Sequence, residues 1–302
     1  TLLNLSVHTG PTFNPSSFII HSITRITRIT RITLPRSIKP YQSSSESMSF
    51  PVAPAFGALR LASLRDVPRI ATVATAGFFY SPVFPWERRF HRDFPTDTFR
   101  SYEKMFADAI ISPDYVALVV EDSHDPAEAE KTGATIKPDV KIPTPKAGDP
   151  VIVGVATWKL QPNSTRRGQF IAPEDSSAVR HVFDGGLGRD KSPFHADMLD
   201  EKCDAAEEKY FEGHLVDMVV VHPAYWRRGH GTCLVEWGKA LADIDRVDQG
   251  VIAADMGEKL YTSLGYGKLD DVRAVSGDGP PPHEVQVGVL RYSGPWSAGA
   301  EL

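Results

Sequence analysis

Two things are scarce in this chain, cysteine and long apolar runs, and both absences narrow what it can be. Only Cys203 and Cys233 occur among its 302 residues. Two cysteines argue against a disulfide framework, which favours a reducing compartment and a cytoplasmic location. Pro, Gly or charged residues interrupt every apolar run well before the roughly 20 residues that a membrane-spanning helix needs. The sequence predicts a globular protein with no membrane partner.

Acidic residues are missing from the first 45 positions, where five basic residues lie in and around a Thr-Arg-Ile repeat. An acid-poor segment rich in Arg and Ser is typical of a mitochondrial transit peptide, so a mitochondrial location is the alternative. A three-residue period, however, drifts around a helix and does not hold one face. Residues 1–47 are therefore predicted to be a disordered, low-complexity segment that need not belong to the native protein.

Without that segment the chain is clearly acidic. Residues 1–47 carry +4, from five basic residues and Glu46, so the formal charge of −5 for the whole chain leaves −9 for residues 48–302. Such a surface repels phosphates, which argues against a nucleic-acid partner. A hydrophobic content of 41% is enough to fill a core, and residues 48–302 are expected to form a single domain.

Strands and helices can be predicted along most of this body from hydrophobic periodicity and from Pro and Gly positions. Two polar or charged segments, at about 122–149 and 161–213, are expected to be insertions, the first of them a long solvent loop. Residues 82–95 are expected to form a surface loop or short helices. Strands are predicted at 57–66, 115–121, 151–160, 215–221, 250–254 and 284–292, and helices at 66–76, 97–111, 192–211, 231–244 and 258–264. Antiparallel strands followed by a β-helix-β unit indicate one mixed α/β domain.

The clearest chemical signal is the stretch 219–233, VVVHPAYWRRGHGTC. An apolar strand ends at Pro223, and after Arg227 and Arg228 a Gly-x-Gly step leads into an amphipathic helix. A helix N-terminus presents unpaired amides and the positive end of the helix dipole, and glycines let a phosphate approach the backbone closely. Thr232 adds a hydroxyl in the first turn. The stretch is predicted to cradle a phosphate.

The sequence of this stretch also argues against two classes of phosphate-containing ligand, nucleoside triphosphates and dinucleotides. The sequence contains no Gly-Lys-Ser/Thr step, which argues against a nucleotide P-loop. The dinucleotide fingerprint requires Gly or Ala where Leu234 lies, and it turns directly from the strand into glycine, whereas here five residues follow Pro223 first. A dinucleotide-binding oxidoreductase is thus a weaker alternative.

The extended pattern from Val219 to Gly231 resembles motif A of the GNAT superfamily of N-acetyltransferases, here of a small fungal type, whose loop surrounds the pyrophosphate of coenzyme A. Residues 257–266, GEKLYTSLGY, resemble motif B of the same family. The resemblance is close over 215–266 and loose over 57–160. Two positions depart from it, because Trp226 replaces the usual Gln or Arg and Gly257 replaces the usual Ala.

The resemblance implies a GNAT fold, which is a mixed, mostly antiparallel sheet of six to seven strands flanked by helices. The fourth and fifth strands splay apart, and the pantetheine arm of acetyl-CoA hydrogen-bonds to the exposed strand edge. No metal is implied. The residues assigned to acetyl-CoA binding are Val219, Val220, Val221, Arg227, Arg228, Gly229, His230, Gly231, Thr232 and Ala254.

Two catalytic residues are predicted. The resemblance implies that Tyr261 protonates the departing thiolate, and an ordinary core tyrosine is the alternative. Asp217 is the one carboxylate in an apolar run, which makes it the candidate base that takes a proton from the attacking amine. Its alternative is a solvent-facing residue on an alternating strand.

The implied activity is acetyl transfer from acetyl-CoA to a small-molecule or peptide amine, and the acidic body favours a cationic acceptor. Specificity is expected in residues 78–92 and 161–213. A non-catalytic module that senses acyl-CoA is the alternative function. The sequence indicates neither the acceptor's identity nor an oligomeric state.

Overall fold

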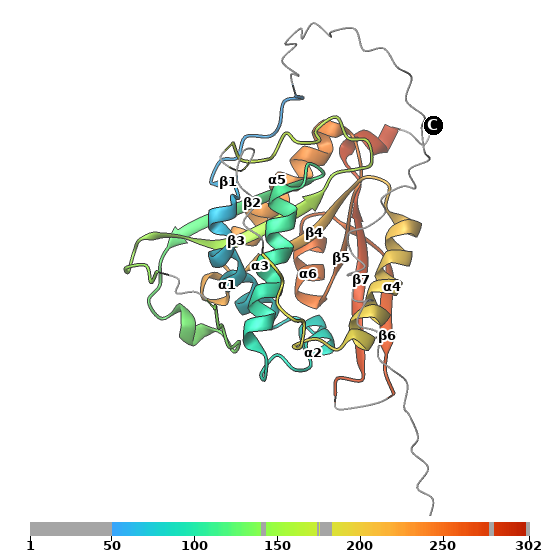
Figure 1. The fold of residues 1–302 in the computed structure, drawn as a ribbon. Coiled ribbons are helices and arrows are strands. Elements are labelled where there is room, and N and C mark those ends of the chain that lie inside the picture. The colour runs from blue at the N-terminus through green and yellow to red at the C-terminus, as the bar shows by residue number, and fades with distance from the viewer. Residues whose placement is uncertain (1–49, 140–142, 174, 176–182, 278–280, 300–302) are drawn as a thin grey trace, which may run out of the picture. The chain divides into compact units, whose positions relative to one another are not determined.

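The computed structural model describes residues 50–302 except 140–142, 174, 176–182, 278–280 and 300–302, so the expectation for residues 1–47 lies outside the described part. Across that part a seven-stranded sheet runs in the order β1-β2-β3-β4-β5-β7-β6 (Figure 1). Every neighbouring pair is antiparallel except β4 and β5. The strands are β1 Leu59–Leu61, β2 Tyr115–Ser123, β3 Pro150–Lys159, β4 His214–Val221, β5 Gln249–Ala253, β6 Gly267–Val275 and β7 Glu284–Tyr292. The predicted mixed, mostly antiparallel α/β fold is confirmed.

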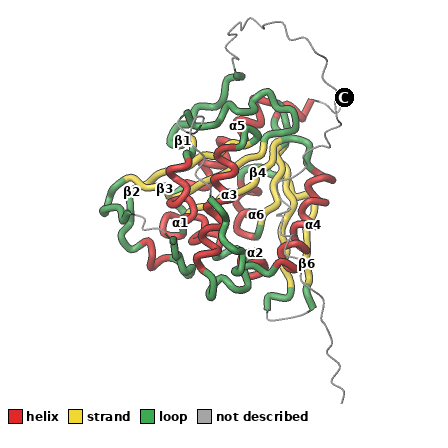
Figure 2. Tube along the Cα trace, in the orientation of Figure 1, coloured by secondary structure: helices red, strands yellow, loops and turns green. Residues whose placement is uncertain are grey.

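Helices cover both faces of the sheet (Figure 2). The α-helices are α1 Val67–Phe78, α2 Val83–Glu87, α3 Pro95–Ile111, α4 Pro193–Tyr210, α5 His230–Asp245 and α6 Asp255–Ser263. Short 3₁₀ turns are η1 Leu64–Asp66, η2 Glu128–Lys131, η3 Pro223–Tyr225 and η4 Pro295–Gly299. Within the described residues no helix combines the length and the apolar character that crossing a membrane requires.

The alternation of side chains along β4 and β5 shows which face of the sheet each helix covers. On β4, Val216 belongs to the core under α5 and α6, whereas Val220 belongs to the core under α1 and α3. On β5, Val251 faces α6, and Ile252 packs into a third cluster with α4. Because successive side chains of a strand point to opposite faces, α4 lies on the same face as α1 and α3.

The strand β4 contains the feature that shapes the centre of the sheet. Against β3 its register passes from Met218 opposite Thr157 to Val216 opposite Trp158, which leaves Asp217 as an extra residue in a β-bulge. Pairing with β5 is limited to His214–Val216 and stops where the bulge begins. A bulge bends a strand and raises its twist, so β4 diverges from β5 beyond this point. The predicted splay of the two strands is confirmed.

Most predicted elements are present within a few residues of the expected bounds, with three differences. The strand β6 was not predicted, because only Val272 and Ala274 of this edge strand are buried and charged residues hide the alternation. The 82–95 segment contains the short helix α2, as predicted, but it lies only partly at the surface, since Phe90 is exposed while Trp86 and Arg88 are buried. The 122–149 segment is not wholly a solvent loop, because it begins inside β2 and buries Glu128.

Candidate functional site

The loop between β4 and α5 has the geometry of an anion cradle. Arg227 has a φ of 65° and Gly229 a φ of 87°, so two left-handed residues turn the chain into α5. Cys233 donates the first helical hydrogen bond to the Gly229 carbonyl at 2.9 Å. The amides of the three residues between them, 230–232, therefore precede the intrahelical bonding and remain available to a ligand.

The glycines keep the cradle open. A Cβ built at Gly229 would have no atom within 4 Å, so the loop there faces free space. At Gly231 a Cβ would lie 3.4 Å from Leu260 Cδ2 on α6, so α5 and α6 lie close together at this glycine. At Gly229 the space that a Cβ would enter is open, and a phosphate needs such space to approach the backbone, so this part of the loop fits the pyrophosphate of coenzyme A.

The two arginines of the loop differ in their surroundings. The Arg228 guanidinium donates to Asp122 Oδ2 at 2.9 Å and to the Ala224 carbonyl at 3.3 Å, and it lies 5.0 Å from the centre of the Tyr225 ring. Arg227 is exposed and forms no ion pair with any described residue. Of the two, Arg227 is the guanidinium free to meet a phosphate.

Trp226, which departs from the family pattern, points away from the cradle. Its indole Nε1 donates to the Val221 carbonyl at 2.7 Å, and its ring meets the edge of the Tyr80 ring at a centroid distance of 5.2 Å. The Trp226 side chain therefore covers the last residue of β4 and occupies its carbonyl group. It supplies none of the polar contact that Gln or Arg would offer a pyrophosphate.

The remaining predicted binding residues line the opening between β4 and β5. Val219, Val220 and Val221 lie beyond the bulge, on the part of β4 that has no pairing with β5. The Val220 side chain packs under α1, and the other two contact the core under α5. Ala254 lies on the β5 side of the opening, at the N-cap of α6. Thr232 lies in the first turn of α5, half-buried.

Asp217 lies at the bulge. Its Oδ2 accepts a hydrogen bond from Thr157 Oγ1 at 2.9 Å, and the residue is exposed at its surface although many protein atoms lie around its carboxyl group. Burial raises the pKa of the carboxyl, and the Thr157 hydrogen bond and the Lys159 charge oppose this only in part. A carboxylate with a raised pKa is a better proton acceptor than an ordinary one.

Tyr261 lies on α6 in the core under α5 and α6. It is 4% exposed, and its ring meets the edge of the Tyr266 ring at 5.1 Å. No described residue hydrogen-bonds its hydroxyl. Burial raises its pKa, so the hydroxyl holds its proton at neutral pH and can act as a donor. A Cβ at Gly257 would lie 3.5 Å from this ring and 3.3 Å from Ala253 Cβ, so glycine at this position gives α6 a close approach to β5.

The structure also brings residues to the site that sequence reasoning missed. Asp122 at the end of β2 contacts the cradle through Arg228 and His230. Thr157 on β3 contacts Asp217. Both lie on other strands, 60 or more positions away in the sequence from their partners, and neither belongs to a local motif.

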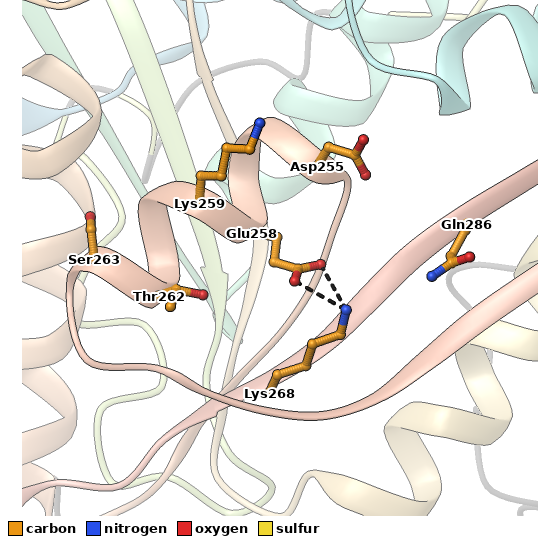
Figure 3. Close-up of a pocket in the computed structure, with 7 residues that line it drawn as sticks. All are labelled: Asp255, Glu258, Lys259, Thr262, Ser263, Lys268 and Gln286. Atoms are coloured by element: carbon orange, nitrogen blue, oxygen red, sulfur yellow. Dashed lines mark hydrogen bonds and ion pairs between the residues drawn. The ribbon is translucent and has the colours of Figure 1, made fainter.

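A separate hollow of about 620 Å³ lies outside this site, between α6 and the strands β6 and β7 (Figure 3). Lys268 forms ion pairs there with Glu258 at 3.0 Å and with Asp271 at 2.8 Å. The positive charge of Lys268 is therefore balanced by these two carboxylates. None of the predicted binding or catalytic residues lines it. Within the described part of the chain, no group of three or more His, Cys, Asp or Glu side chains could hold a metal ion.

Comparison with known proteins identifies the family. No family model matches the sequence. A protein of Stachybotrys chartarum named acetyltransferase is 35% identical over 224 residues, which cover 74% of this chain and 86% of the relative. Among solved structures, a Corynebacterium glutamicum protein described as histone acetyltransferase HPA2 and related acetyltransferase aligns with 78% of this chain and 95% of its own (TM-score 0.43, 15% identity). Arabidopsis thaliana NAA60 in complex with acetyl-CoA aligns with 78% and 96% (TM-score 0.37, 15% identity). The two sequence motifs, the splayed strands and the identity to the Stachybotrys protein together show that this chain belongs to the GNAT acetyltransferase superfamily and is an acyltransferase.

Proposed function

We propose that the protein transfers an acetyl group from acetyl-CoA to the amine of a cationic acceptor. The observation that carries this proposal is the opening between β4 and β5, which has the Gly229 cradle at one end and Asp217 at the other. When bound, acetyl-CoA would supply the acetyl group as a reactive thioester. The chain's own residues bind it, orient it and move the protons.

Binding divides into two parts. The free amides of residues 230–232 and the Arg227 guanidinium hold the pyrophosphate, because unpaired amides and a cation favour anions at a helix N-terminus. The edge of β4 beyond Val216 has no pairing with β5 and hydrogen-bonds the extended pantetheine arm as an added strand would, up to the Val221 carbonyl, which already accepts from Trp226. A backbone amide of the same edge also stabilises negative charge that develops on the reacting carbonyl oxygen.

The two proton transfers use opposite faces of the sheet. Thr157 lies between Ala156 and Trp158, whose side chains belong to the core under α5 and α6, so Thr157 faces the other side. Asp217, its hydrogen-bond partner, therefore takes the proton of the amine on the side of α1, α3 and α4. Tyr261 donates to the thiolate from the side of α6. The gap between β4 and β5 connects the two faces at this point of the sheet.

The acceptor side carries carboxylates that suit a cationic amine. Burial raises the pKa of Glu207 on α4 to about 7, with the Lys159 charge opposing and the Asp204 and Asp217 charges adding to the rise. Asp200, an exposed residue of the same helix, has its pKa raised to about 6 by partial desolvation and by the Glu87 charge. A bound cation would favour the ionised form of both acids. We therefore infer that the acceptor is positively charged when it binds.

The role of Asp217 predicts a pH dependence. Asp217→Asn should lower kcat/KM by about 10²- to 10⁴-fold, as expected for loss of a general base. In the wild type, kcat/KM should fall as the pH drops through the raised pKa of Asp217, because only the ionised form accepts a proton. Thr157→Val removes the hydrogen bond that lowers this pKa, so the acid limb should move to higher pH while activity at its plateau persists. A Thr157→Val profile identical to wild type would rule against Asp217 as the base.

The activity itself is tested by mixing the full chain with acetyl-CoA and a panel of amines and by following the release of free thiol. We expect release with amines that carry a second positive charge and little with neutral amines of the same length. Binding of coenzyme A without thiol release for any amine would favour a sensor. Binding of a nicotinamide dinucleotide in its place would refute the assignment of the cradle.

A further inference from the structure

Asp122 connects the cradle to a strand that takes no part in the opening. It lies one residue before the end of β2, opposite Val151 of β3. From there its carboxylate reaches the first residue of α5 and the loop before it. Both carboxylate oxygens are engaged, since Oδ1 accepts from the Ser123 amide at 2.7 Å and Oδ2 accepts from two cradle side chains.

The two contacts of Oδ2 flank the left-handed Gly229. Arg228 Nη1 donates at 2.9 Å from one side, and His230 Nε2 lies 3.0 Å away on the other. Burial favours the neutral acid, but the hydrogen bonds from Ser123, Arg228 and His230 hold the pKa of the Asp122 carboxyl below its usual range. One ionised oxygen thus joins the residues before and after the glycine.

We propose that Asp122 is a positioning residue for the coenzyme A pyrophosphate, because it fixes the cradle through Arg228 and His230 while Arg227 meets the phosphate. This inference rests on the proposed function. A loop fixed before binding loses less conformational freedom when the ligand arrives, and its affinity for the ligand rises accordingly. Arg228, although next to Arg227, then serves the loop and not the ligand.

Charge alone predicts the opposite effect, which makes the inference testable. A carboxylate beside an anion site repels the anion, so an Asp122 without a positioning role would weaken coenzyme A binding by its charge. Removing the side chain would then tighten binding. Under our proposal the loosened loop outweighs the lost repulsion, and removing the side chain weakens binding.

The experiment is isothermal titration of coenzyme A into the full chain carrying Asp122→Ala. We expect roughly tenfold weaker binding, the scale of losing charge-assisted hydrogen bonds that order a site. The KM for acetyl-CoA should rise with it, whereas kcat at saturation and the KM for the amine should stay within about twofold. Asp122→Asn keeps one acceptor oxygen and should give an intermediate affinity.

Glu121→Ala is the matched control, because Glu121 precedes Asp122 on β2 and pairs with Arg60 away from the cradle. It should leave the affinity for coenzyme A unchanged. Equal or tighter coenzyme A binding by Asp122→Ala, or a fall in kcat together with a lower melting temperature, would overturn the positioning role. A wild-type chain that binds no coenzyme A would instead overturn the proposed function, so the two failures are distinguishable.

Discussion

Replacing Gly229 with valine is expected to abolish coenzyme A binding while the protein remains folded. At a φ of 87° a β-branched residue is strongly strained, so the loop would leave its present path. The side chain would also enter the free space in front of the amides, where the pyrophosphate must approach. Titration calorimetry should show a loss of affinity of at least about 10²-fold.

The control for strain alone is Gly168→Val. Gly168 also has a left-handed φ, of 79°, with no atom within 4 Å of a Cβ, but it lies in a turn that hydrogen-bonds Pro113. Both variants should lose similar thermal stability, and only Gly229→Val should lose binding. Gly231→Val should lose binding as well, because a larger side chain would collide with Leu260. Unchanged affinity in both cradle variants would disprove the assignment of the loop.

Tyr261→Phe should reduce kcat by about 10²- to 10⁴-fold, the usual range for a lost general acid, with little change in coenzyme A affinity. Because no described residue hydrogen-bonds the Tyr261 hydroxyl, its removal breaks no internal hydrogen bond. The melting temperature should therefore stay close to that of the wild type. The measurement is turnover per folded molecule that binds coenzyme A.

Tyr266→Phe provides the matched control for Tyr261→Phe. Tyr266 is buried next to Tyr261, and its hydroxyl donates to the side chain of Gln249. Loss of this buried hydrogen bond should destabilise the fold by about 1–3 kcal/mol and leave turnover per folded molecule intact. If Tyr261→Phe also keeps wild-type turnover across the pH range, Tyr261 is a core residue and water or another group supplies the proton.

The fold and the strand-turn-helix geometry of the loop before α5 could be predicted from the sequence for a physical reason. The residues from Val219 to Gly231 are contiguous, and a strand, a proline, a glycine step and a helix are each fixed by local chemistry. Tyr261 was found in the same way, because it lies in a second contiguous motif. The motif does not show, however, whether the Tyr261 hydroxyl has a hydrogen-bond partner, because that depends on tertiary packing.

What the sequence did not reveal depends on contacts between distant segments. Asp122 ends an apolar run and looks like an ordinary solvent residue until the sheet brings it to α5. Asp217 was singled out, but the bulge that exposes it exists only in register with β3. The strand β6 escaped detection because an edge strand with one covered face retains many charged residues.

The extra residue in β4 also has a consequence for how this strand tolerates change in length. If position 217 is skipped, Val216, Met218, Val219 and Val220 alternate regularly between the two cores, as in an uninterrupted strand. The alternation of apolar side chains thus needs no residue at this position. Asp217 is an extra residue between two halves of the strand, and in each half the side chains alternate regularly between the two faces of the sheet. A one-residue deletion at 217 would restore the phase and extend the ladder toward β5. The shortened strand would pack as well as before, and it would have no opening for a substrate.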